Sequence, residues 1–167
     1  AVRGGAADPD RSRQVRRVAD EPGVLALVRR SRLAGVGAVR TLLEAEAARL
    51  AAANAGTAGI TALEELCAEG ERAVAADDVD GAVAMNARFH AKVMELAGNA
   101  VLAELAAQVD RRVRWYYTPV ARQRGHQSWI EHRDLIAAIA ARDEPRATQV
   151  MRAHTEHTRK TYHEREK

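Results

Sequence analysis

Residues 86–99 read NARFHAKVMELAGN, and this stretch decides the fold. Asn86 and His90 stand four residues apart in a helical pattern, so both side chains leave the same face about one turn apart. Gly98 favours the end of a helix and Asn99 favours the cap of the next one. The stretch therefore predicts two successive helices joined by a very tight corner, with two polar side chains aligned on the first helix.

Working outward from this corner, apolar residues recur at helical spacing and no strand pattern competes with them. The helices that this spacing predicts run from about Pro22 to Arg32, from about Val36 to Asn54, from a cap at Thr57, from Asp77–Asp80 to Leu96, from Asn99 to about Tyr117, from Ser128 to Arg142, and from Asp143 onward. Pro119 is expected to end the fifth of them and Val120–Gln127 to form a polar loop. The sequence predicts an all-α fold.

Composition limits the number of domains and the class of protein. The chain has 167 residues, of which 47% are hydrophobic and 4% aromatic, so one domain with a core of small aliphatic residues is expected. The single cysteine, Cys67, excludes an internal disulfide. No apolar run is long enough for a membrane span or has the layout of a signal peptide, so we expect a cytoplasmic protein that does not associate with membranes.

Basic residues crowd the beginning of the chain, although the net charge is only +3. The segment 1–34 is predicted to be basic and partly disordered, or a linker, and residues 35–167 to form the helical domain. A nucleic-acid-binding arm is disfavoured because no aromatic residues are interleaved to stack on bases. The arginines concerned are Arg11, Arg13, Arg16, Arg17, Arg29, Arg30 and Arg32.

Two further histidines, His132 and His154, each belong to a separate later helix. Together with Asn86 and His90, they allow three helices to aim nitrogen and oxygen donors at one interior point, as bundle proteins do when they build metal sites. The other histidines, His126, His157 and His163, fall in the predicted loop or in a charged segment and are expected to be solvated.

From Val39 to His154 the chain resembles the effector-binding (FCD) domain of FadR-type GntR transcriptional regulators. The order and spacing of several pieces carry the resemblance, including the separation of 22 positions from His132 to His154. The pieces are Val39 to Glu44 leading to Ala51-Ala52, Asn86 to His90, Ala97-Gly98-Asn99, Glu131-His132 with Ile136 and Ala138-Ile139, and Met151 to His154.

The resemblance implies an antiparallel bundle of six or seven helices with a divalent metal at its centre, held by one Asp and three His. Here the ligands would be Asn86, His90, His132 and His154, with Asn86 in place of the usual acid. Imidazole favours zinc or nickel. A small carboxylate effector would bind at the metal, and one of Arg111, Arg112 and Arg114 is a candidate to pair with it.

The resemblance further implies a ligand-sensing domain that is not an enzyme and that works in a homodimer. DNA would be bound only through a winged helix-turn-helix domain, which we do not find in this chain.

Two alternatives belong to other classes of function. One is a metal-free helical module for interaction or dimerisation, in which Asn86 marks the decay of the site. The other is a metalloenzyme, which is disfavoured because the chain lacks the paired Glu-x-x-His motifs of di-metal bundles. A mononuclear hydrolase would also need a base at the metal, and Glu131 points roughly 100° away from His132 around the helix.

Overall fold

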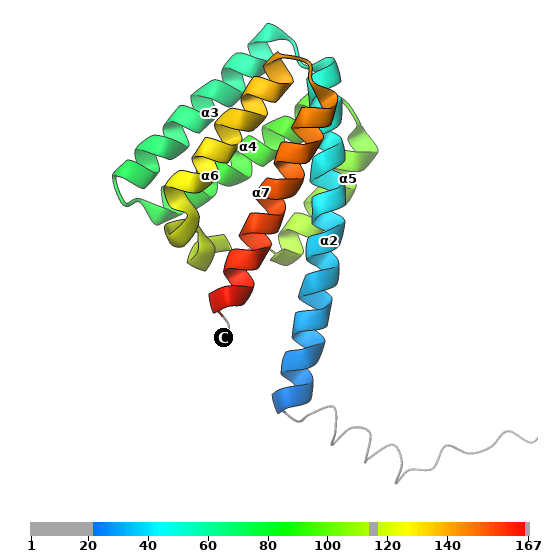
Figure 1. The fold of residues 1–167 in the computed structure, drawn as a ribbon, viewed down its shortest axis with the longest axis vertical. Helices are drawn as coiled ribbons and strands as arrows, with labels where there is room; N and C mark the ends of the chain where they lie inside the picture. Colours follow the sequence, from blue (N-terminus) through cyan, green and yellow to red (C-terminus); the bar gives the residue numbers. More distant parts are fainter. Residues whose placement is uncertain (1–21, 114–116, 166–167) are drawn as a thin grey trace, which may run out of the picture. The chain divides into compact units, whose positions relative to one another are not determined.

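The computed structural model describes residues 22–113 and 117–165. Contacts divide the chain into two units, Ala1–Gly35 and Val36–Lys167, and the helical bundle belongs to the second. In the described ranges the ordered elements are six helices and no strands, so the predicted all-α fold is confirmed. The helices in Figure 1 are α2 (Pro22–Asn54), α3 (Thr57–Ala75), α4 (Val79–Leu96), α5 (Ala100–Val113), α6 (Tyr117–Ala140) and α7 (Glu144–Arg165).

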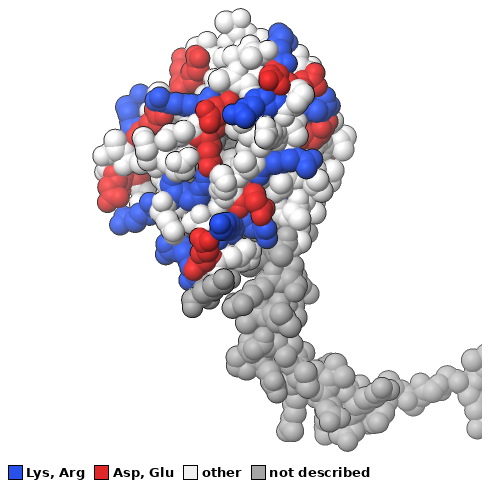
Figure 2. Space-filling view, in the orientation of Figure 1, with Lys and Arg blue, Asp and Glu red and all other residues white. Residues whose placement is uncertain are grey.

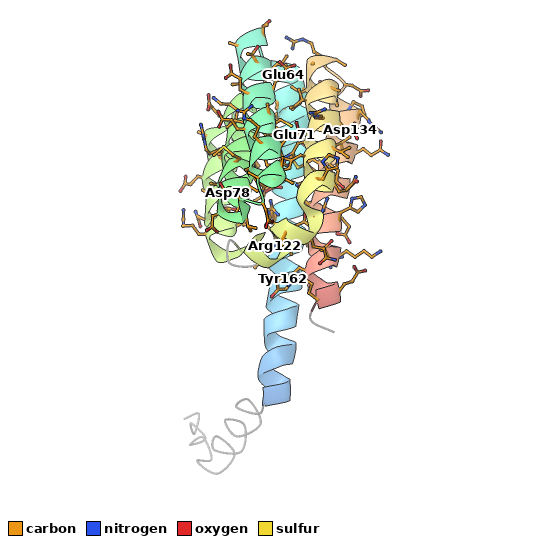
Figure 3. The ribbon with its side chains drawn as sticks, turned by 90° about the vertical axis from the view of Figure 1, so that its left-hand side faces the viewer. Glu64, Glu71, Asp78, Arg122, Asp134 and Tyr162 are labelled. Carbon is orange, nitrogen blue, oxygen red and sulfur yellow. The ribbon has the colours of Figure 1, made fainter. Side chains whose placement is uncertain are left out.

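The helices of the bundle pack mostly as antiparallel neighbours, and α4 also packs against α6 (Figure 1). Helix α3 packs against α4 and α6, α6 packs against α7, and α4 also contacts α5. Arg122 near the beginning of α6 and Tyr162 near the end of α7 lie toward the same end of the bundle (Figure 3). At that end Val120 packs against Val36 and Tyr162, which closes a small second core.

Alanines make the main core possible because they let helix backbones approach closely. Ala47, Ala48, Ala51 and Ala52 of α2 are each fully buried. Bulkier side chains from the other helices fill the centre beside them, among them Phe89, Leu63, Leu135, Ile139 and Met151. The small-residue composition thus becomes a close-packed interior in which volume changes are costly.

The corner between α4 and α5 forms as predicted. Gly98 adopts φ +69°, a left-handed conformation that costs glycine little. The Leu102 amide donates to Asn99 Oδ1 at 3.0 Å, which caps α5. Asn54 Nδ2 donates to the Ala97 carbonyl oxygen at 2.9 Å and fixes the end of α2 to this corner.

Four local predictions were wrong. The separate helices expected at 22–32 and 36–54 are one helix, α2, and Gly56 rather than Thr57 occupies the cap of α3. Pro119 does not end a helix; it lies in the first turn of α6, where a missing N–H costs little, and the predicted end of the fifth helix near Tyr117 falls next to residues 114–116, which lie outside the described residues. Residues 120–127 are helical and not a loop, with a kink at Gly125, and α6 runs through Ser128 to Ala140.

The segment 120–127 was misjudged because Arg124 reads as a surface residue but is buried. Its guanidinium donates to the His154 carbonyl oxygen at 3.1 Å and to Thr158 Oγ1 at 2.9 Å. These partners on α7 satisfy the polar head, so this polar segment packs into the bundle as a helix.

The surface carries both signs of charge. On the face shown in Figure 2, basic and acidic side chains are interspersed and neither sign forms a continuous region. Among the described residues, no helix combines the length and the apolar character that crossing a membrane requires.

Candidate metal centre

Three histidines from three helices converge in the interior. His90 lies on α4, His132 on α6 and His154 on α7, and their exposed fractions are 8%, 1% and 3%. Taking one ring nitrogen from each, all three atoms lie within 4.8 Å of one another. The ring centroids are 5.3 Å apart for His90 and His132, 5.1 Å for His90 and His154, and 4.6 Å for His132 and His154.

Several polar atoms at this convergence lack partners. Both ring nitrogens of His90 and both of His132 are buried without a hydrogen bond. Buried polar atoms are normally paired, because burying them unpaired is costly. Nitrogens that each lie about 2.0–2.1 Å from a tetrahedral zinc ion are about 3.3 Å apart. To reach that spacing, the three ring nitrogens would have to move closer to one another by at most about 1.5 Å. The donor set therefore fits a divalent ion.

Glu131 fixes the orientation of His154. Its Oε2 lies 2.8 Å from His154 Nδ1, and its Oε1 lies 2.8 Å from His157 Nδ1. An ionised carboxylate only accepts, so Nδ1 of His154 carries the proton and Nε2 keeps its lone pair. Arg124 forms an ion pair with the same carboxylate.

Glu44 of α2 lies beside His90. Its Oε2 is 3.2 Å from His90 Nδ1, within ion-pair range, although the two atoms are not aligned as a hydrogen bond. Its Oε1 accepts from Arg40 Nε at 2.7 Å. Burial alone would raise the pKa of Glu44, but Arg40 and His90 outweigh it and lower the pKa to about 2.

Burial favours the neutral form of His132 and His154. Burial lowers the pKa of His154 to about 4, although the hydrogen bond to Glu131 opposes that shift. Burial also lowers the pKa of His132 well below its usual range, and the neighbouring His154 adds to the shift. Phe89 stacks on His132 with ring centroids 4.1 Å apart, and the edge of Trp129 meets the same imidazole at 4.7 Å.

A model of the FCD domain family matches residues 36–157. The chain belongs to this family. The prediction made from the order and spacing of its motifs is confirmed.

Solved structures agree with this assignment at the level of fold. Streptococcus agalactiae GntR is 24% identical with a TM-score of 0.66, and the match covers 75% of this chain and 57% of that one. E. coli McbR/YncC is 18% identical with a TM-score of 0.73, and the match covers 82% of this chain and 66% of that one. The chain thus spans less than two thirds of either structure. No curated protein matches it.

The FCD fold places the predicted site residues as follows. His90, His132 and His154 are brought together. Asn86 is half-buried one turn before His90 and lines two pockets, one beside His154 and one beside His90. Arg111 lines the second pocket and is exposed, whereas the side chains of Arg112 and Arg114 lie outside the described residues.

Sequence reasoning missed the two carboxylates of the FCD centre. Glu44 was named within a motif of the resemblance, and the only chemical role considered for Glu131 was that of a catalytic base. Their positions in the sequence could have indicated that both lie near the histidines. Glu44 falls on the buried stripe of α2, and Glu131 directly precedes the candidate ligand His132. His157 was expected to be solvated; its side chain is 58% exposed, yet it contacts Glu131.

Metal-free protein should lose stability as the pH falls from about 6.5 to about 4. The folded pKa of His154 is lowered to about 4 from an ordinary 6.5, so protons bind the unfolded chain more readily. The stabilising contribution is complete above pH 6.5 and is lost toward pH 4; for one such group it amounts to about 3 kcal/mol.

Urea unfolding at pH 7.5, 5.5 and 4.5 with a chelator present measures this loss. The His154→Gln variant should show a smaller decline than the wild type over the same interval. Parallel declines in the two proteins would contradict the assignment of this proton uptake to His154.

Proposed function

We propose that this chain is the ligand-sensing domain of a GntR-type transcriptional regulator, with a divalent ion, zinc or nickel, held by His90, His132, His154 and Asn86. The observation that carries the proposal is the set of buried imidazole nitrogens that face one another without hydrogen-bond partners. Membership of the FCD family supports a regulatory rather than an enzymatic role.

The surrounding residues are suited to hold such an ion. Glu131 orients His154 and Glu44 lies against His90, which is how outer carboxylates commonly support metal-binding imidazoles. Asn86 would offer its carbonyl oxygen, a weaker donor than a carboxylate. When bound, the ion would supply a positive charge that attracts an anionic ligand.

The charge balance of the site favours a carboxylate effector. Each acid near the histidines is matched by a guanidinium, Glu44 by Arg40 and Glu131 by Arg124. The two pairs are neutral overall, and the proposed ligands are neutral as well, so the ion would keep its full charge. A small carboxylate would compensate that charge while displacing only water.

The regulatory output is proposed at the level of the full-length protein. Effector binding would shift the packing of α4, α6 and α7 around the site, and in a homodimer this shift would alter the spacing of two separate winged helix-turn-helix domains. Exposed apolar side chains such as Leu42 (59%) and Val101 (67%) provide surface for self-association.

Gently purified protein should contain one divalent ion per chain. Replacing His132 or His154 with Ala should abolish metal retention, because each removes one of three converging imidazoles. His157→Ala is the matched control, since His157 lies three residues beyond His154 on the same helix and is largely exposed. Elemental analysis gives the stoichiometry. Equal metal content in all three variants would contradict the assignment of His132 and His154 as metal ligands.

Asn86→Asp should bind the metal more tightly than the wild type. The substitution adds a charged oxygen donor of the kind the family usually has at this position. Affinity is measured by competition with a chromophoric chelator, with the exposed His126→Asp as the control for added charge. Unchanged or weaker binding would remove Asn86 from the ligand set.

Small di- or hydroxy-carboxylates, such as citrate or lactate, should raise the melting temperature of metal-loaded protein only. At about 100 times its dissociation constant a ligand adds roughly 2.7 kcal/mol, which corresponds to several degrees. Thermal shifts are recorded with and without a chelator. Equal shifts in both conditions would show that the metal is not the anchor, and no shift with any acid would favour a metal-free interaction module.

A further inference from the structure

A large groove lies against the histidine centre on the side of α5. Its volume is about 760 Å³, and residues of α2, α4 and α5 line it. Small apolar side chains form most of its walls, so we call it the alanine groove. Its alanines are Ala84, Ala87 and Ala91 of α4 and Ala103, Ala106 and Ala107 of α5.

The alanine groove is elongated because it follows two antiparallel helices. Its lining on α4 extends from Asp80 to Glu95, a length of about 22 Å at 1.5 Å per residue. The tight corner at Gly98 brings Ala103 near the Glu95 end and Arg111 near the Asp80 end. Asp80 and Glu95 mark the two ends of the lining on α4, and alanines and His90 lie between them.

The wall of the groove carries buried polar groups that point to a ligand. His90 is 8% exposed and its Nε2 has no partner, whereas its Nδ1 lies 3.2 Å from Oε2 of the buried Glu44. Both residues line the alanine groove together with Arg40. The groove thus gives an apolar molecule access to the polar centre.

The size and lining of the groove indicate the class of effector. Pockets of about 300–1,000 Å³ accommodate drug-sized ligands, so a molecule as small as lactate would leave most of this groove unfilled. We propose that the effector is an elongated amphipathic carboxylate, whose head lies beside His90 and whose apolar chain or ring system, of roughly eight or more carbon atoms, lies along the alanines. This inference rests on the proposed carboxylate-sensing function.

A homologous series of straight-chain carboxylates, from acetate to decanoate below their micellar concentrations, tests the proposal on zinc-loaded protein. Calorimetry should give binding that strengthens roughly two- to fourfold per added methylene, because each buried methylene adds up to about fourfold. Chelation of the metal, or His90→Ala, should weaken every member of the series.

Variants that fill the groove test the contribution of the apolar tail to affinity separately from that of the carboxylate head. Ala103→Leu and Ala106→Leu should remove most of the chain-length gain and leave acetate affinity and zinc content unchanged. Ala137→Leu is the matched control, because Ala137 is an exposed helical alanine on α6 away from this groove. It should leave the whole series unchanged.

The outcomes distinguish this inference from the function on which it rests. Metal-dependent binding of short acids without any gain for longer ones would overturn the inference and leave the sensing function in place. No binding of any acid would overturn both. A chain-length gain that survives chelation and His90→Ala would overturn the placement of the head. If the leucine variants changed the oligomeric state in sedimentation instead of ligand affinity, the groove would be a protein interface and the inference wrong.

Discussion

The Glu131 carboxylate is the interaction on which the interior depends, because it joins α6 to α7 beside the three histidines. It accepts from His154 and His157 of α7 and pairs with Arg124, which itself donates to the His154 carbonyl oxygen. Removing the carboxylate would leave His154 Nδ1 buried without its acceptor and Arg124 buried without its counter-charge, which is more costly than never having buried them. The position of His154 in the centre follows from this network.

A second buried pair, Arg40 with Glu44, performs the corresponding task for α2 and α4. The two pairs place ionised groups near the imidazoles without adding net charge, and burial is the main cause of the low pKa values of His132 and His154. Buried ion pairs are weak contributors to stability in general, since desolvation offsets their attraction. Their benefit here is orientation, because Glu131 accepts from His154 and Glu44 lies against His90.

The sequence predicted most of the helices because they depend on local rules, and it predicted the histidine cluster because three histidines on separate helices matched the spacing of the FCD family. Helical spacing, the Gly98–Asn99 corner and the i,i+4 placement of Asn86 and His90 are properties of short segments. The role of Arg124 could not be read in this way, since a polar residue in a polar segment reveals its burial only when α7 supplies the acceptors. Glu44 was missed for the same reason, because its neighbour His90 comes from another helix.

The alanine groove shows why a composition cannot specify a cavity. In α2 the buried alanines let neighbouring helices approach until the space between them is filled. In α4 and α5 the same residue type lines a gap of about 760 Å³. The difference lies in where the backbones are held: Asn54 fixes the α4–α5 corner to the end of α2, while the alanines beyond it have too little bulk to fill the space. A ligand that supplied the missing apolar volume would complete the packing of these helices and so couple its binding to their spacing.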